Sequence, residues 1–302
     1  MTSSGNESAR TVWLVRNAAS GSNDEDAVKA VCTALGEAGF VLARDLCFPE
    51  EPAPTPAELR AAEVGMLVVF GGDGTVHSVV TAAAGWDGPL LVLPGGTMNI
   101  LARKLHGEAP APEIVARLAS RPIRRARPAV VRSRHGMGLS GVLAGPGAIW
   151  NEVREAMRTA NVLELVSAAR EAITYSATGP KVICEQVDCG REEGYAAITV
   201  TPHEDGLEAK GYYAETLGDF AGQGIALLNR DFRNGPHDEL GRHPRLRLVC
   251  PQEEQMGLLI DGEPFDGAAH ETFELAPCPV DLVTTLEEAE AGPGEAGKPD
   301  AR

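Results

Sequence analysis

The chain has 302 residues, of which 43% are hydrophobic and 23% are charged, a composition typical of globular proteins that excludes wholesale disorder. Asp and Glu number 43 against 27 Lys and Arg, so the formal net charge is −16. So acidic a chain is a poor candidate for nucleic-acid binding, because duplex affinity rests mostly on the neutralisation of phosphates. The length suits two domains of ordinary size.

The sequence contains neither a signal peptide nor an apolar run of the roughly 18 residues that span a bilayer. We therefore expect a cytoplasmic protein that contacts membranes only from the surface. Its six cysteines contain no CxxC pair, and reduced thiols fit their irregular spacing better than a disulfide framework does. The histidines other than His77, whose role is considered below, show no metal-ligand spacing. No zinc site is predicted.

Short apolar runs alternate with amphipathic segments in the first part of the chain. Strands are predicted at 11–15, near 40–46, and at 65–70 and 89–94, the last two being apolar on both faces as in a parallel sheet. Ser22 and Glu25 resemble a capping box at a helix start, and Thr55 and Glu58 form another. The alternation predicts a doubly wound α/β domain over residues 1–127.

From about residue 128 the pattern changes to short segments rich in Val, Ile, Leu and Tyr, separated by turn residues. One helix is predicted at 151–175, and strands at 181–187, 195–200, 246–250, 257–260, 271–275 and 280–284. We therefore predict a C-terminal β-rich, sandwich-like domain over 128–286. The tail, 287–302, has nothing to bury and is predicted to be disordered.

Three glycine-rich turns directly follow predicted strands of the first domain. They are Asn17-Ala18-Ala19-Ser20-Gly21, Gly71-Gly72-Asp73-Gly74-Thr75 and Pro94-Gly95-Gly96-Thr97-Met98-Asn99. In an open parallel sheet, ligands bind beyond the carboxyl ends of the strands, where all three turns fall. Glycines let backbone amides approach a phosphate, and the following helices point their positive ends at the same place. A carboxylate such as Asp73 fits there if Mg²⁺ lies between it and the phosphates.

Each turn alone is explained as well by a tight connection between strand and helix, but three at equivalent positions favour a phosphate site. GGDGT after a buried strand, with PGGTMNILAR after the next, resembles the catalytic domain of the diacylglycerol kinases. That family includes sphingosine, ceramide and bacterial lipid kinases and is related to NAD kinases and phosphofructokinases. The resemblance implies ATP contacts at Asn17, Ser20, Gly21, Gly71, Gly72, Asp73, Gly74, Thr75, Gly96, Thr97 and Asn99.

The resemblance also implies an active site in the cleft between the domains, to which the second domain contributes the turn Asp261-Gly262-Glu263. It assigns to this turn the general base that takes the proton from a lipid hydroxyl, with Glu263 as first choice and Asp261 beside it. On the residues alone, Asp-Gly between apolar runs predicts a type I′ hairpin, and a hairpin tip can be both turn and catalyst. The family's Mg²⁺ loop, of the form DDGLL, has a weak match in Glu204-Asp205-Gly206-Leu207, which makes Asp205 a weak candidate for a metal ligand.

Three segments depart from the family pattern. Ala18 replaces a proline, and Ser78 stands where a glutamate is usual, which puts the catalytic rate in question. A proline-rich acidic loop at 47–54 replaces a Thr and a Gly-His pair near the phosphates, so no residue is carried over there.

Nine of the 27 basic residues fall between Arg103 and Arg134. Such a cluster could face anionic lipid headgroups, at about 1 kcal/mol per residue, or it could offset acidic neighbours, and the sequence leaves both readings open. His77 follows GGDGT and could contact a phosphate, although a packing role explains it as well.

We therefore expect an ATP- and Mg²⁺-dependent lipid kinase that phosphorylates a hydroxyl of diacylglycerol, giving phosphatidate, at the inner membrane face. Ceramide or a sphingoid base is the alternative substrate. A kinase of a soluble acceptor such as NAD and a non-catalytic nucleotide-binding regulatory protein are the other readings. A homodimer is compatible with the sequence, which does not specify the oligomeric state.

Overall fold

The computed structural model describes residues 10–17, 25–120, 122–146, 181–186, 190–195, 197–212, 237–251 and 254–286. The chain divides into two compact units. One reaches to Ala126 and resumes at Val280, and the other runs from Arg127 to Pro279. The first unit is therefore discontinuous in sequence, and the second is inserted into it.

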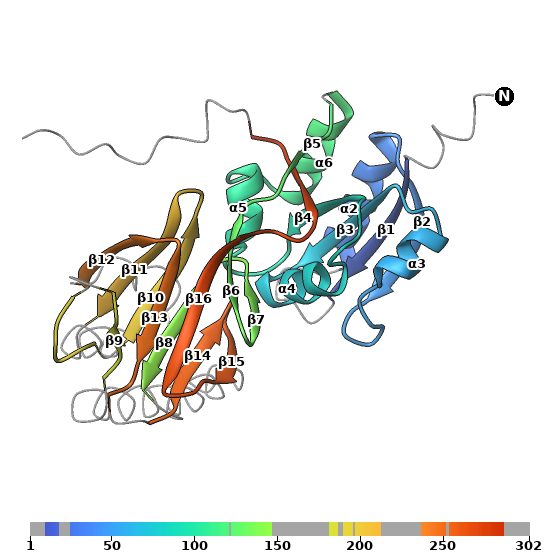
Figure 1. The fold of residues 1–302 in the computed structure, drawn as a ribbon. Coiled ribbons are helices and arrows are strands. Elements are labelled where there is room, and N and C mark those ends of the chain that lie inside the picture. The colour runs from blue at the N-terminus through green and yellow to red at the C-terminus, as the bar shows by residue number, and fades with distance from the viewer. Residues whose placement is uncertain are drawn as a thin grey trace, which may run out of the picture. The chain divides into compact units, whose positions relative to one another are not determined.

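A six-stranded sheet forms the centre of the first unit (Figure 1). In spatial order its strands are β2 (Val41–Cys47), β1 (Thr11–Arg16), β3 (Met66–Gly71), β4 (Pro89–Pro94), β17 (Asp281–Thr284) and β5 (Arg124–Ala126). All neighbours are parallel except β17 and β5. Every residue of β3 is buried, as expected for a strand that is apolar on both faces. The predicted α/β architecture is confirmed.

Helices cover this sheet. Those described are α2 (Glu25–Glu37), α3 (Pro56–Ala61), α4 (Asp73–Ala82), α5 (Ile100–His106) and α6 (Ala111–Ser120). The second predicted capping box is confirmed, since Thr55 Oγ1 accepts the Glu58 N–H at 3.4 Å and Glu58 Oε2 accepts the Thr55 N–H at 2.8 Å. Ser22, from the first predicted box, lies outside the described residues. No helix in the described part of the chain is long and apolar enough to cross a membrane.

The predicted C-terminal border of the second domain is wrong, because the last strand belongs to the first unit. The run at 280–284 is predicted within the β-rich domain, but β17 pairs with β4 in parallel and with β5 in antiparallel fashion. Leu282 and Val283 are fully buried in the first unit, and Thr284 Oγ1 donates to the Leu105 carbonyl of α5 at 2.8 Å. The apolar run thus completes the first unit's sheet, and the second unit ends at Pro279 rather than at residue 286.

Two antiparallel sheets form the second unit, in the orders β12-β11-β10-β8-β14-β15 and β7-β6-β16-β13-β9. Their strands are β6 (Ala129–Ser133), β7 (Gly136–Gly138), β8 (Val142–Pro146), β9 (Ile183–Cys184), β10 (Ala197–His203), β11 (Gly206–Tyr212), β12 (His237–His243), β13 (Arg245–Val249), β14 (Met256–Ile260), β15 (Glu263–Asp266) and β16 (His270–Pro277).

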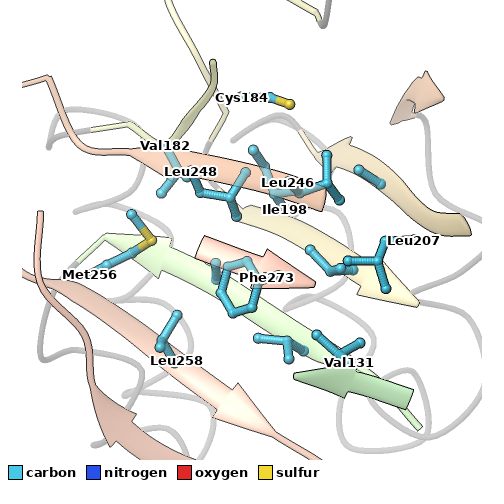
Figure 2. Packing of buried hydrophobic residues seen from close by; sticks show 14 of the residues in the cluster. Val131, Val182, Cys184, Ile198, Leu207, Leu246, Leu248, Met256, Leu258 and Phe273 are labelled. Atoms are coloured by element: carbon cyan, nitrogen blue, oxygen red, sulfur yellow. The ribbon is translucent and has the colours of Figure 1, made fainter. Parts of the chain in front are cut away.

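The core of this unit is shared by both sheets. Val131 of β6, Leu248 of β13 and Phe273 of β16 come from one sheet and pack with Ile198 of β10 and Leu258 of β14 from the other (Figure 2). Buried and half-buried residues alternate along β14, which is the period expected of a strand with one face in a core. The predicted β-rich, sandwich-like architecture is confirmed.

Two smaller expectations for this unit are wrong. The strand predicted at 181–187 is reduced to Ile183–Cys184 and an isolated bridge between Val182 and Tyr195. Cys184 is disulfide-bonded, with its partner outside the described residues, whereas Cys32, Cys47, Cys250 and Cys278 are free. Irregular spacing does not exclude a disulfide, because the bond depends on which side chains the fold brings together. The predicted helix at 151–175 and the tail at 287–302 lie outside the described residues.

Candidate functional site

The strand order of the first sheet reverses at β1, which has β2 on one side and β3 on the other. Ligands of open α/β sheets bind at such a switch point, beyond the carboxyl ends of the strands. Asn17 follows β1, and its Nδ2 donates to Thr75 Oγ1 in the turn after β3 at 2.9 Å. Its backbone N–H donates to the Phe70 carbonyl at 3.3 Å. The structure thus places Asn17, the first residue of the first glycine-rich turn, against the second turn at the switch point.

The second and third turns touch through their backbones. The Gly95 N–H donates to the Gly71 carbonyl at 3.1 Å. A Cβ atom added at Gly96 would lie 2.5 Å from the Gly72 Cα, and one added at Gly71 would lie 2.9 Å from the Thr75 side chain. Because real Cβ atoms do not approach other atoms so closely, these positions require glycine.

Two residues predicted to contact ATP also shape the turns. Asn99 has a left-handed backbone, with φ of 51°, and its side chain forms two hydrogen bonds with the Gly96 backbone, at 2.8 and 2.7 Å. Asp73 Oδ1 accepts the N–H of Ile100 at 2.8 Å, which joins the first residue of α4 to the first residue of α5. These contacts fix the turns before any ligand arrives.

The start of α4 fits a polyphosphate. Its N-cap is Gly72, which has no side chain to bond the first-turn amides. Such amides and the positive end of a helix attract anions. Mg²⁺ is commonly held by one or two carboxylates together with phosphate oxygens, and Asp73 supplies one carboxylate at this place. Ser78, at the family's glutamate position, donates from Oγ to the Gly74 carbonyl at 3.0 Å and so bonds within its own helix.

A cavity of about 470 Å³ lies beside the turns, and Phe70, Pro94, Asn99, Arg103 and Ala111 are among its lining residues. Its volume lies in the range of small-molecule sites. Of the other residues predicted to contact ATP, Thr97 is exposed and Gly74 is half-buried, whereas Ser20 and Gly21 lie outside the described residues.

The Asp261–Gly262 turn of the second unit has the predicted hairpin geometry. Both residues have positive φ, 50° and 86°, and Ile260 pairs with Glu263 across the turn, as in a type I′ hairpin. The Asp261 carboxylate accepts three backbone N–H groups, from Leu139 at 2.7 Å, Ser140 at 2.7 Å and Gly141 at 3.2 Å. Glu263, the first residue of β15, is exposed. The two acidic residues therefore have different surroundings.

Asp205, the weak metal candidate, lies in the turn between β10 and β11. Both of its carboxylate oxygens accept hydrogen bonds from Arg242 Nη1, at 3.0 and 2.9 Å, and this contact lowers the pKa of Asp205. Among the described residues, no three His, Cys, Asp or Glu side chains lie close enough to hold a metal ion. The structure thus places Arg242 at Asp205, and the same guanidinium also pairs with Glu208 at 3.1 Å.

Much of the basic segment from Arg103 to Arg134 is paired with carboxylates. The ion pairs are Arg103–Glu108 at 3.5 Å, Arg117–Glu113 at 2.8 Å, Arg125–Asp281 at 3.5 Å, Arg132–Glu274 at 2.7 Å and Arg134–Glu271 at 2.6 Å. This pairing favours the reading in which the cluster offsets acidic neighbours.

Sequence reasoning missed the charged group around Glu271. Its carboxylate is fully buried and contacts Arg134 and His135. Strand periodicity could have found it, because residues two apart share a face and Glu271 therefore lies on the same face as the core residue Phe273.

Residues 11–131 match the family model of the diacylglycerol kinase catalytic domain. No curated protein is similar in sequence to the chain.

Three solved structures from Bacillus anthracis str. Sterne share the fold. That of a diacylglycerol kinase is 18% identical, with a TM-score of 0.60, over 91% of this chain and 97% of that one. Two others, each identified provisionally as a diacylglycerol kinase, are 18% and 17% identical, with TM-scores of 0.63 and 0.61. They cover 91% of this chain and 95% and 97% of their own. Residues 11–131 are thus similar to the diacylglycerol kinase catalytic domain, and the solved structures share the fold of the chain.

Proposed function

We propose that this protein is an ATP-dependent lipid kinase that transfers the γ-phosphate of ATP to a hydroxyl of diacylglycerol, giving phosphatidate, at the inner membrane face. The observation that carries the proposal is the interlocked pair of glycine turns at the switch point, where Gly72 and Gly96 meet and Gly72 begins α4. Within a diacylglycerol kinase catalytic domain, this arrangement suits the phosphates of ATP.

In this proposal the first unit positions the nucleotide. The first-turn amides of α4 bind phosphate oxygens, and the contacts of Asn17 and Asn99 keep the turns in place. Mg²⁺ held by Asp73 and the phosphates would offset the charge of the transferring group. The Ile100 N–H holds one oxygen of Asp73, so the carboxylate is oriented in advance.

Glu263 acts as the general base and Asp261 shapes the turn. Three amides already occupy the Asp261 carboxylate, whereas Glu263 is exposed at the start of β15. As the lipid oxygen bonds to the γ-phosphorus, the bond from that phosphorus to the β–γ bridging oxygen breaks and ADP leaves. The hydroxyl proton passes to Glu263.

A non-catalytic, nucleotide-binding regulatory role is the second candidate. The observation that favours it is Ser78, whose hydroxyl bonds within α4 and offers no carboxylate to the site. Ceramide or a sphingoid base remains the alternative lipid within the first proposal.

Transfer of radiolabelled γ-phosphate tests these assignments. Purified protein receives Mg²⁺, labelled ATP and mixed micelles of diacylglycerol, ceramide, sphingosine or monoacylglycerol, with NAD as a soluble control. We expect label in diacylglycerol. Label in another lipid would change the substrate, label in NAD would refute the lipid kinase, and ATP binding without transfer to any acceptor would support the regulatory role.

Variants then test the residues. Glu263→Gln should abolish transfer but keep ATP binding, and Asp73→Asn should abolish transfer while its amide oxygen still accepts the Ile100 N–H. The matched control is Glu239→Gln, an exposed carboxylate on β12 at the opposite edge of the sheet that contains β15. It should transfer normally. Normal transfer by Glu263→Gln would overturn the assignment of the base.

A further inference from the structure

We propose that Glu271 is a positioning residue that holds the turn carrying Asp261 and Glu263. This inference deepens the proposed function and rests on it. The contacts of Glu271 described below include neither Asp261 nor Glu263. Glu271 acts through two segments that flank the turn.

The buried carboxylate of Glu271 is the meeting point of several contacts. Its side chain is 0% exposed, and Oε1 accepts hydrogen bonds from Arg134 Nη2 at 2.6 Å and from the Ala268 N–H at 2.7 Å. The same oxygen lies 3.0 Å from His135 Nε2. Oε2 is also buried and has no hydrogen-bond partner among the described residues.

These contacts join segments that are distant in sequence. Arg134 and His135 form the connection between β6 and β7, and Ala268 comes shortly after the end of β15. The His135 ring also packs on Phe265 of β15, with 5.8 Å between ring centroids. Glu271 therefore fixes the far end of β15, the four-residue strand that begins with Glu263.

The other route from Glu271 leads to Asp261. The three-residue strand β7 separates His135 from Leu139. Leu139, Ser140 and Gly141 supply the three N–H groups that hold the Asp261 carboxylate. The β6–β7 connection thus lies one short strand from the Asp261 contacts, and Glu271 restrains the hairpin from both sides.

The energetics argue that this carboxylate serves more than packing. A buried charged group costs free energy even when it is paired, and replacement of a whole buried ion pair by apolar residues is often neutral or stabilising, whereas removal of one partner destabilises. Oε2 adds to that cost, because it is buried and the part of the chain that the structure describes gives it no partner. An apolar side chain beside Phe273 would suit the core better, so we infer that the carboxylate is used to set the position of the turn.

Glu271→Met tests the proposal, since it fills similar space and removes the contacts. We expect a folded protein of lower thermal stability, because Arg134 and the Ala268 N–H lose their acceptor. We also expect a kcat for lipid phosphorylation lower by about 10- to 100-fold and an unchanged KM for ATP. The matched control is Glu274→Met on the same strand, which removes a carboxylate paired with Arg132 at 2.7 Å. Its kcat should be unchanged. A folded Glu271→Met protein with normal kcat would overturn the proposal, as would a fall in kcat matched by the control.

Hydrogen exchange separates this inference from the proposed function, because it needs no activity. In Glu271→Met, exchange of the Leu139 and Ser140 amides should accelerate about tenfold or more, while Glu274→Met leaves it unchanged. If the parent protein transfers no phosphate but the exchange still accelerates in Glu271→Met, the proposed kinase activity is refuted and the positioning role is retained. Unchanged exchange would refute the positioning role. If Glu271→Met fails to fold, His135→Ala breaks the same connection to Phe265, and the same two measurements with the same expected results decide.

Discussion

His106, the last residue of α5, is buried at 1% exposure, and this burial lowers its pKa from 6.5 to about 4. Its Nδ1 lies 3.0 Å from Thr285 Oγ1, and the nearby charge of Arg117 lowers the pKa further. The folded protein therefore holds this imidazole in its neutral form until the solution is quite acidic.

The shift predicts a loss of stability in acid. Between pH 6.5 and about 4 the unfolded chain protonates His106 but the folded protein does not, so the free energy of unfolding falls as the pH falls. At 1.36 kcal/mol per pKa unit, the fall from this residue is about 3 kcal/mol by pH 4. Above pH 6.5 both states hold a neutral imidazole, and the contribution of His106 no longer varies.

Urea unfolding, followed by the fluorescence of the buried Trp13 and Trp86 of the first unit, measures this effect across the acid range. His106→Asn keeps a polar group near Thr285 but cannot titrate, so the difference between parent and variant should vary by about 3 kcal/mol between pH 7 and 4. Carboxylates titrate in both proteins and cancel in that difference.

Thr285→Val is the control. It removes the hydroxyl beside His106 without exposing the ring, so it should lower stability by about 1 kcal/mol while the pH dependence persists. Equal pH dependence in the parent and His106→Asn would refute the reasoning.

Three further predictions concern the turns and helix ends. Asp261→Asn tolerates the positive φ but sets an NH₂ group against a backbone N–H, so urea unfolding should show a loss of about 1–3 kcal/mol; an unchanged midpoint would contradict it. The added methyl group of Gly96→Ala has no room beside Gly72, so this variant should lose ATP binding in calorimetry. The control, Gly36→Ala in α2, meets no atom within 4 Å; it should bind ATP normally, and its free energy of unfolding should rise by about 0.5–1 kcal/mol. Thr55→Ala loses the capping box of α3 and should lower thermal stability by about 1 kcal/mol, and a neutral result would contradict the cap.

Local signals in the sequence predicted much of the fold. The apolar runs of β1, β3 and β4 follow from residues that suit both faces of a parallel sheet. The Thr55 capping box and the Asp261–Gly262 hairpin were predictable because each depends on residues only one to three positions apart.

Contacts between distant residues could not be predicted in this way. The run at 280–284 looks like the β-rich segments that precede it, and nothing in its residues says that β4 and β5 are its partners. Asp73 was predicted at the site, but its hydrogen bond to Ile100 depends on how two turns pack. The same holds for Glu271, which meets Arg134 only because β16 pairs with β6.

The return of β17 to the first unit has a consequence for how the chain is made. On the ribosome, β1 to β5 emerge long before the strand that separates β4 from β5 in the finished sheet. Among the described strands, β5 pairs only with β17, so it can join the sheet only after residues 281–284 have been synthesised. The inserted second unit is complete by Pro279 and can acquire its core first. We therefore expect the first unit, although its synthesis begins first, to be the last to finish folding.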